Sequence, residues 1–248
     1  MFQISQGNKT FVNASFELME NLQNVQTYIV DPPYNIGFNY KNEFKDNLKM
    51  DEYAQLNWDL LNFMFVSFKD DSSCFYINYP EKIAELYPVF MDSEWRIHQW
   101  IFWVYPSNIG VNARKFTKST RAILWLVKDE PKIYINAVQQ PYKNPNDKRI
   151  KELIESGKKG TNLYDWWEIN MCKNVSKDKN DYVNQIPDEL LKRLILTTTD
   201  ENDMVADPMC GSGSTLMTAD RLNRKAFGMD INANLIPIWE KHCGVNNG

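Results

Sequence analysis

Histidine and cysteine are scarce in this sequence, which contains two His and four Cys in 248 residues. The cysteines show no short Cys-x-x-Cys spacing, so the sequence predicts neither a disulfide framework nor a zinc site. Cys172, Cys210, His242 and Cys243 would have to be gathered by the fold to hold a metal, and a core or surface role is favoured for each. With only His98 and His242 available, we do not expect a histidine general base.

Long apolar runs are also absent. No run approaches the length of a membrane span, and the N-terminus lacks the basic-then-apolar pattern of a secretion signal. Together with the cysteine usage, this predicts a reduced, cytoplasmic protein with no membrane partner.

An excess of basic charge is missing too. The net charge is −4 and the sequence pI is about 5.4, whereas a protein that coats DNA is expected to be basic. The basic residues are unevenly spread: residues 111–128 contain five and no acidic residue, and residues 143–160 contain six against three acidic ones. Contact with phosphate and a plain solvated face are equally good explanations of these two stretches.

The remaining composition suits one compact enzyme. Hydrophobic residues make up 43% of the chain and aromatic residues 13%, enough to fill the core of a single large domain with a subsidiary lobe. No internal repeat or low-complexity tract stands out.

The tetrapeptide Asp31-Pro32-Pro33-Tyr34 directly follows the apolar run Tyr28-Ile29-Val30, where a buried strand would end at a cleft. Asp31 supplies an anionic acceptor, and the Pro32 carbonyl supplies a neutral one, since Pro33 has no amide hydrogen. Tyr34 offers a ring for stacking. These residues suit binding of a planar ring that bears an amino group. The alternative is a Pro-Pro turn that only caps the strand.

A second motif, residues 207–215, lies between a strand-like run that ends at Ala206 and a helix-like run that begins at Leu216. Gly211 and Gly213 permit a tight turn, and such a strand–turn–helix unit lets backbone amides approach a nucleotide-like ligand. The next strand-like run ends at Asp230, about 20 positions on, where an acid would hold a ribose diol. A glycine turn used for packing alone is the competing interpretation.

Taken together, the two motifs resemble those of S-adenosylmethionine-dependent DNA amino methyltransferases of the permuted β class, in the adenine-N6 type. In that family the Asp-Pro-Pro-Tyr motif comes first, a target-recognition region follows, and the cofactor motif lies near the C-terminus. Strand-like segments also fall where the family places them, at residues 74–78, 100–104 and 122–127. The resemblance covers nearly the whole chain outside residues 137–182.

The resemblance implies an α/β fold: a doubly wound, mostly parallel, Rossmann-like sheet with helices on both faces and one antiparallel edge element. It divides the chain into a catalytic part at 1–136, a small target-recognition insert at 137–182 with a short helix at 150–155, and a cofactor-binding part at 183–248. In the insert, Trp166 and Trp167 are expected to anchor it to the core rather than stack on a base. Residues 35–52 form either a loop that closes over a flipped base or a plain connection.

Site residues follow from the same resemblance. The catalytic residues it implies are Asp31, Pro32, Pro33 and Tyr34. The S-adenosylmethionine-binding residues it implies are Asn13, Asp207, Pro208, Met209, Cys210, Gly211, Ser212, Gly213, Ser214, Asp230, Ile231 and Asn232, with no metal. Residues 184–191 resemble the segment that closes over the methionine end of the cofactor.

Three positions depart from the family pattern. Met209 replaces the usual Phe, Ile186 replaces a Lys before proline, and Asn13 stands where Asp is common. Met can fill the same apolar wall against adenine. Without the Lys, the cofactor carboxylate depends more on backbone amides.

The implied activity is transfer of a methyl group to the N6 amino group of adenine in double-stranded DNA, after the target base has been flipped out. Cytosine N4, adenine in RNA and a catalytically silent nucleic-acid-binding subunit are the alternatives. A nicotinamide-dependent oxidoreductase is disfavoured, because the third glycine of its motif is missing and because it leaves Asp31-Pro32-Pro33-Tyr34 without a role. A homodimer and a cognate restriction endonuclease are the partners that the resemblance suggests.

Overall fold

The computed structural model describes residues 1–40, 44–106, 114–172 and 185–245. Its centre is a nine-stranded sheet in the order β1-β2-β11-β10-β3-β4-β6-β5-β9. The strands are β1 (Phe2–Gln6), β2 (Lys9–Asn13), β3 (Val25–Val30), β4 (Phe68–Asn78), β5 (Arg96–Val104), β6 (Thr120–Val127), β9 (Trp166–Glu168), β10 (Met204–Asp207) and β11 (Lys225–Asp230). The segments expected to be strands at 74–78, 100–104 and 122–127 lie in β4, β5 and β6.

Side chains along the central strands point alternately to the two faces of the sheet, which divides the core into two layers. Every residue of β3 is buried, as expected for a parallel strand covered on both faces. Ile29 packs in one hydrophobic cluster, and Tyr28 and Val30 pack in the other, because successive side chains point to opposite faces.

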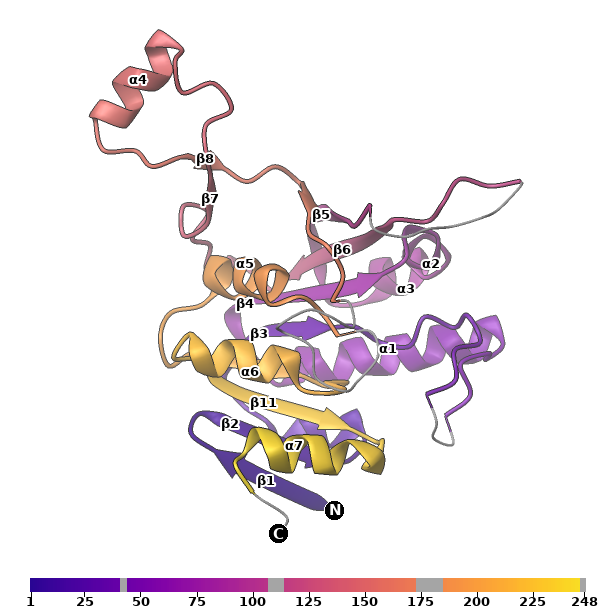
Figure 1. Cartoon of the computed structure of the whole chain (residues 1–248). Helices are drawn as coiled ribbons and strands as arrows, with labels where there is room; N and C mark the ends of the chain where they lie inside the picture. Colours follow the sequence, from indigo (N-terminus) through magenta and orange to yellow (C-terminus); the bar gives the residue numbers. More distant parts are fainter. Residues whose placement is uncertain (41–43, 107–113, 173–184, 246–248) are drawn as a thin grey trace.

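Helices cover both faces of the sheet (Figure 1). Residues of α5 (Asp188–Thr198), α6 (Ser214–Arg221) and α7 (Ile236–His242) belong to the Ile29 cluster. Residues of α1 (Met50–Val66), α2 (Pro80–Glu85) and α3 (Tyr87–Asp92) belong to the Tyr28 cluster. Two short 3-10 helices, η1 (Phe16–Asn21) and η2 (Ala233–Leu235), complete this three-layer α/β arrangement.

Strand direction confirms the expected mostly parallel sheet but corrects one detail. β2, β11, β10, β3 and β4 are mutually parallel, and β1 is an antiparallel edge strand. The expectation of a single antiparallel edge element is wrong, because β6 lies inside the sheet and runs antiparallel to both β4 and β5. The amino end of β6 therefore lies beside the carboxyl ends of its neighbours.

An arm extends from the body between residues 137 and 165 (Figure 1). It consists of the paired strands β7 (Gln139–Gln140) and β8 (Thr161–Asn162) and of α4 (Lys148–Glu155), which has no buried residue. The helix expected at 150–155 lies within α4. The chain then returns to the sheet through β9, where Trp167 is buried and Trp166 is exposed.

Candidate active site

The order of the strands fixes the position of the main cleft. β3 and β10 are parallel neighbours, and from them the chain continues to β4 on one side and to β11 on the other. Such a switch point opens a crevice at the carboxyl ends of the strands. Asp31 directly follows β3 and Asp207 ends β10, and both line a cleft of about 550 Å³. In Figure 1 the arrowheads of β3, β4 and β11 point to this side of the molecule.

Asp31 is held by two side chains, one from its own turn and one from β6. The hydroxyl of Tyr34 donates a hydrogen bond to the Asp31 carboxylate, and Nη1 of Arg121 lies 3.8 Å from Oδ2 of Asp31. Burial raises the pKa of Asp31, while the Arg121 charge and the Tyr34 hydrogen bond act to lower it. Burial has the largest effect, so the pKa of Asp31 lies above its ordinary value.

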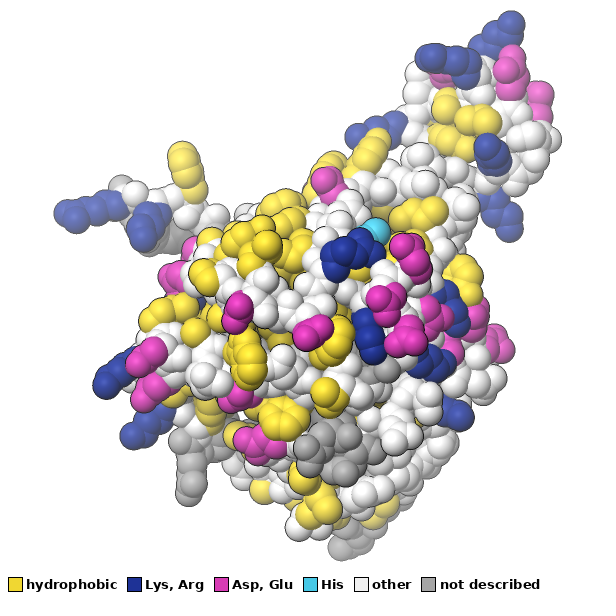
Figure 2. All heavy atoms as spheres, turned by 180° about the vertical axis from the view of Figure 1, so that it is seen from behind, with side chains coloured by type: hydrophobic (Ala, Val, Ile, Leu, Met, Phe, Trp, Pro, Cys, Tyr) yellow, Lys and Arg dark blue, Asp and Glu magenta, His cyan; other side chains and the backbone are white. Residues whose placement is uncertain are grey.

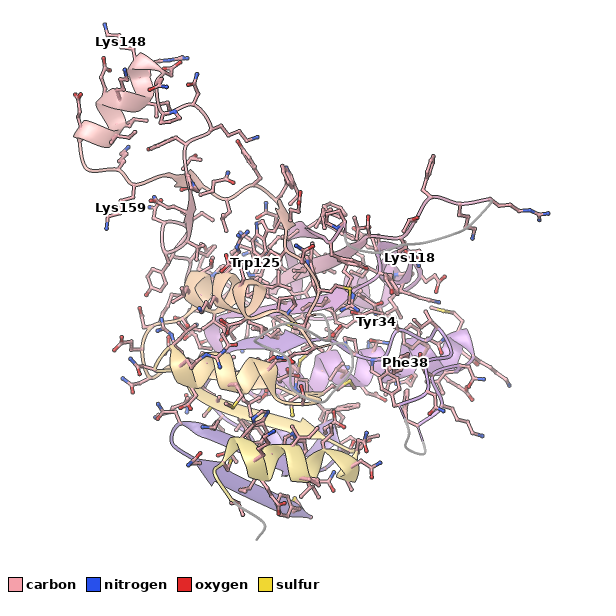
Figure 3. All side chains as sticks on the ribbon, in the orientation of Figure 1. Tyr34, Phe38, Lys118, Trp125, Lys148 and Lys159 are labelled. Carbon is pink, nitrogen blue, oxygen red and sulfur yellow. The ribbon has the colours of Figure 1, made fainter. Side chains whose placement is uncertain are left out.

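Tyr34 contributes its hydroxyl more than a free ring face. Its side chain is 7% exposed, and its ring packs edge-on against Tyr79 with centroids 4.9 Å apart. In Figure 3, Tyr34, Phe38 and Lys118 lie on the same side of the molecule. Other rings therefore offer more of the surface on which a planar ligand could stack.

The segment that follows the Asp31–Tyr34 turn supplies those rings. Phe38, Tyr40 and Phe44 line the cleft, and the Phe38 and Tyr40 rings lie 4.8 Å apart. The buried carboxylate of Asp46 anchors this segment, since it accepts hydrogen bonds from the backbone amides of Asn35, Ile36 and Phe38 at 2.8, 3.1 and 2.8 Å. Residues 41–43 lie outside the described part of the chain.

The glycine turn after β10 has the geometry that its sequence predicts. Gly211 and Gly213 have φ values of 51° and 89°, and α6 begins directly after them. The Asp207 carboxylate accepts hydrogen bonds from the Thr215 hydroxyl at 2.6 Å and from the Met209 amide at 3.1 Å. Burial raises the pKa of Asp207 to about 7, although these hydrogen bonds oppose the shift.

Asp230 stands at the tip of β11, across the turn. Its carboxylate accepts hydrogen bonds from the backbone amides of Gly211 at 3.0 Å and of Asn232 at 2.8 Å. Burial raises its pKa as well. Asn13 supports the same tip from β2, because its side-chain amide donates to the Asp230 carbonyl at 2.9 Å.

Fourteen of the sixteen site residues expected from the sequence line this one cleft. They are Asp31, Pro32, Pro33, Tyr34, Asp207, Pro208, Met209, Cys210, Gly211, Ser212, Ser214, Asp230, Ile231 and Asn232. Asn13 and Gly213 do not line it: Asn13 lies behind Asp230, and Gly213 faces Phe11 in the core. Of the segment 184–191, Gln185 and Ile186 line the cleft, and residue 184 lies outside the described residues.

Other residues of the cleft are not among the site residues expected from the sequence, although those from Ile36 to Phe44 belong to the segment 35–52, for which a loop over a flipped base is one of the two expectations. They are Ser15, Phe16, Glu17, Ile36, Phe38, Asn39, Tyr40, Phe44, Leu56, Tyr79 and Arg121. Arg121 is one of the five basic residues of the stretch 111–128 that could contact phosphate, but it is only 4% exposed and faces Asp31. Tyr79 could have been expected from the sequence, because it directly follows the end of β4 as Asp31 directly follows the end of β3.

The lining chemistry fits S-adenosylmethionine, which carries a ribose diol, an adenine ring and a charged methionine end. One region of the cleft combines the Asp230 carboxylate, the apolar side chains of Met209 and Ile231, and the turn at 207–214. Within the described part of the chain, no cluster of His, Cys, Asp and Glu could hold a metal ion. No helix there is long and apolar enough to cross a membrane.

Comparison with known proteins gives a family match. The model of a family described as DNA methylase, N6_N4_Mtase, matches residues 25–241. Type II methyltransferase M.HpaI of Haemophilus parainfluenzae is 28% identical over 237 residues, which cover 90% of this chain and 70% of that protein. DNA adenine methyltransferase YhdJ of Escherichia coli K12 is also 28% identical over 237 residues, covering 90% of this chain and 77% of the relative.

Solved structures with the same fold include a PvuII DNA methyltransferase described as cytosine-N4-specific. It aligns with a TM-score of 0.75 at 16% identity, covering 98% of this chain and 89% of the other. The complex of M1.HpyAVI with S-adenosylmethionine aligns with a TM-score of 0.67 at 18% identity, covering 94% and 98%. At these identities the structures support the fold.

Proposed function

Because this chain belongs to the DNA methylase family and is therefore an S-adenosylmethionine-dependent methyltransferase, we propose that it methylates the exocyclic N6 amino group of adenine in DNA. The observation that carries the proposal is the single cleft lined by both Asp31-Pro32-Pro33-Tyr34 and the glycine turn at 207–214. This arrangement puts the acceptors for an amine beside a nucleotide-like binding site.

Binding of the cofactor is assigned to the β10–β11 side of the cleft. Asp230 accepts hydrogen bonds from the ribose hydroxyls, since its two backbone partners leave lone pairs on both carboxylate oxygens. Met209 and Ile231 provide apolar contacts for the adenine ring. Backbone amides of the turn and polar groups near Asp207 bind the methionine end.

The exocyclic amine of a nucleobase is a poor nucleophile, because its lone pair is delocalised into the ring. Asp31 and the Pro32 carbonyl accept its two hydrogens, which directs the lone pair toward the methyl group. S-adenosylmethionine supplies that methyl group on a sulfonium, so its transfer needs alignment rather than acid assistance. Asp31 then takes up the proton that the methylated amine releases, and Tyr34 keeps the carboxylate oriented through its hydrogen bond.

A base inside a duplex must leave the stack before it can reach this cleft, at a cost of a few kcal/mol. Stacking on aromatic side chains contributes about 1–3 kcal/mol per base. Phe38 and Tyr40, which line the cleft, are the rings that support this step, with Tyr34 at its floor.

We assign target recognition to the insert at 137–182, of which residues 173–182 lie outside the described part. Figure 2 shows Lys and Arg side chains gathered on the arm that carries α4 and on the projection at residues 114–118. Both features suit contact with phosphates. A cytoplasmic location, a homodimer and a cognate restriction endonuclease, which the resemblance to the family suggests, complete the proposal.

Expression in a bacterium without its own DNA methylation tests the proposal. Genomic DNA is digested to nucleosides and analysed by mass spectrometry, with Asp31→Ala as the control. N6-methyladenine that depends on Asp31 is the expected result. N4-methylcytosine would show that the target base is cytosine and not adenine, and an unmodified genome would contradict activity on DNA.

A further inference from the structure

Arg121 reaches the cleft because of the direction of its strand. β6 begins at Thr120 and runs antiparallel to β4 and β5, so its first residues lie at the carboxyl edge of the sheet. Arg121 pairs with Trp103 near the end of β5. A residue at the start of this strand is therefore in position to act on Asp31, which follows the end of β3.

The guanidinium group of Arg121 is enclosed by aromatic rings. Its central carbon lies 5.0 Å from the ring centre of Tyr34, 5.1 Å from that of Trp103, and 6.0 Å from those of Tyr79 and Tyr105. The side chain is 4% exposed, and its Nε and Nη1 atoms have no hydrogen-bond partner within the described structure. Ring faces attract a cation, but they replace hydration only in part.

Among the described residues, Asp31 is the one carboxylate that forms an ion pair with Arg121, at 3.8 Å. Burying a guanidinium group without full hydrogen bonding is costly, and buried charges are normally paired and hydrogen-bonded. Burial of Arg121 beside Asp31 is therefore poorly explained by a contribution to the stability of the fold alone.

We propose that Arg121 is a positioning residue that keeps the Asp31 carboxylate ionised and oriented toward the substrate amine. This inference rests on the role given to Asp31 in the proposed function. Arginine suits the task because it keeps its charge at every accessible pH. A protonated Asp31 would lose an acceptor for the amine hydrogens, so methyl transfer would fall wherever the carboxylate takes up a proton.

Other titratable groups around Asp31 limit how its ionisation can be measured. The phenols of Tyr34, Tyr76 and Tyr105 have pKa values raised by burial, so they remain neutral at acid and neutral pH. The phenol of Tyr79 also faces Arg121. Asp207 has a pKa of about 7 and interacts electrostatically with Asp31, so its own titration adds to the pH dependence.

The test is the pH profile of kcat at saturating cofactor and DNA for the wild type, Arg121→Met and Arg121→Gln. An arginine beside a carboxylate lowers its pKa by about 1–3, so both neutral variants should move the acid limb of the profile upward by about that amount. At pH values below the limb, kcat should fall about tenfold for every pH unit by which the limb moves. The series is repeated with Asp207→Asn, which removes the neighbouring carboxyl whose pKa is about 7.

Two further variants control for charge and for folding. Arg96→Met removes an arginine from the opposite end of β5, where it bonds to the Asp129 carbonyl, and should leave the limb in place. Arg121→Lys keeps a cation on a shorter side chain and should move the limb upward by less. If neither neutral variant folds, as judged by cofactor binding, the pH profile of Arg121→Lys tests the inference instead. An acid limb that moves upward supports it, and an unmoved limb contradicts it.

Unmoved limbs in folded Arg121 variants, with kcat lowered equally at every pH, would overturn the inference and leave Arg121 a structural role. Active Asp31→Ala protein would instead contradict the proposed function itself. The two failures are therefore distinguishable.

Discussion

Asp31 and Asp230 are both buried carboxylates at strand tips, but their partners differ in kind. Asp31 is held by side chains, the Tyr34 hydroxyl and the Arg121 guanidinium. Asp230 is held by two backbone amides of the turns that flank it. Side-chain partners can rearrange when a substrate arrives, whereas backbone partners fix a carboxylate in advance. This contrast matches a reacting role for Asp31 and a binding role for Asp230.

Replacing Asp230 with Ala should weaken binding of S-adenosylmethionine about 10- to 100-fold, because a hydrogen bond to a charged group contributes about 1.5–3 kcal/mol. Isothermal titration calorimetry measures the change. Asp230→Asn, which keeps one acceptor oxygen, should lose less affinity than the alanine variant. Unchanged affinity in both variants would contradict the assignment of Asp230 to the cofactor.

Asp207 should make stability depend on pH. Its pKa is about 7 in the folded protein, against about 3.9 in an unfolded chain. Between these values the unfolded chain has lost a proton that the folded protein retains, so this carboxyl lowers the free energy of unfolding as pH rises from about 4 to about 7. Above that range its effect is constant.

Asp207→Asn removes this dependence. Urea unfolding of the cofactor-free protein at pH 5 and pH 8 should show the variant gaining stability relative to the wild type at the higher pH. Asp31 and Asp230 are present in both proteins, so the difference between the two reports the ionisation of Asp207 together with its electrostatic interaction with these two carboxyls. A difference that stays the same at both pH values would show that Asp207 ionises normally.

At the scale of elements, the turn between β10 and α6 depends on Gly213. Its φ is 89°, and an added Cβ would come within 2.3 Å of Phe11 Cε1. Phe11 cannot easily yield, because it is fully buried and stacks on Trp239 at 5.5 Å. The turn therefore requires glycine for two separate reasons, conformation and space.

Gly213→Ala should lower the free energy of unfolding by about 2–5 kcal/mol, the sum of left-handed strain and overpacking. Gly37→Ala is the matched control. Its φ is 79° but no atom lies within 4 Å of an added Cβ, so only the conformational cost of about 1–2 kcal/mol applies. Equal losses in the two variants, measured by urea unfolding, would show that contact with Phe11 is unimportant.

Local patterns predict much of this fold. The apolar run before Asp31 and the glycine turn after β10 are each encoded within about ten residues. Such segments specify strand, turn and helix through periodicity and glycine, independently of the rest of the chain. This is why most expected site residues line one cleft. Gly213, by contrast, is needed for the conformation of the turn and does not line the cleft, so its expected role in cofactor binding stays a prediction.

Arg121 cannot be found in this way. Its neighbours in sequence suggest a solvated basic stretch, and Lys118 and Lys115 fit that description. The buried position of Arg121 follows from the antiparallel insertion of β6 between β4 and β5, a pairing of distant segments. The same insertion explains why a single antiparallel edge element is the wrong expectation.

At the scale of the whole molecule, the arm is more basic than the chain as a whole, since residues 143–160 contain six basic and three acidic residues. The arm carries Lys148 and Lys159, which Figure 3 shows far from Tyr34, and no residue of α4 is buried against the body. Affinity for DNA can thus be supplied by the projections even though the net charge is −4. Binding should consequently be modest and sensitive to salt.

Replacing Lys148, Lys151 and Lys159 together with Ala should weaken DNA binding across sequences and reduce the salt slope by about one for each phosphate that the arm no longer neutralises. Fluorescence anisotropy at several salt concentrations measures both quantities. Lys225→Ala, at the amino end of β11, removes a charge at the opposite edge of the sheet and should change neither. An unchanged slope in the triple variant would remove the arm from the DNA-binding surface.

The central claim is that Asp31 accepts the hydrogens of an adenine amine while the facing cofactor site delivers the methyl group. The most direct measurement incubates purified protein with methyl-labelled S-adenosylmethionine and unmethylated genomic DNA, and then identifies the labelled nucleoside. The wild type should yield labelled N6-methyladenine, and Asp31→Ala should yield none while still binding the cofactor. Label retained in the Asp31→Ala reaction, or absent from both reactions, would contradict the account.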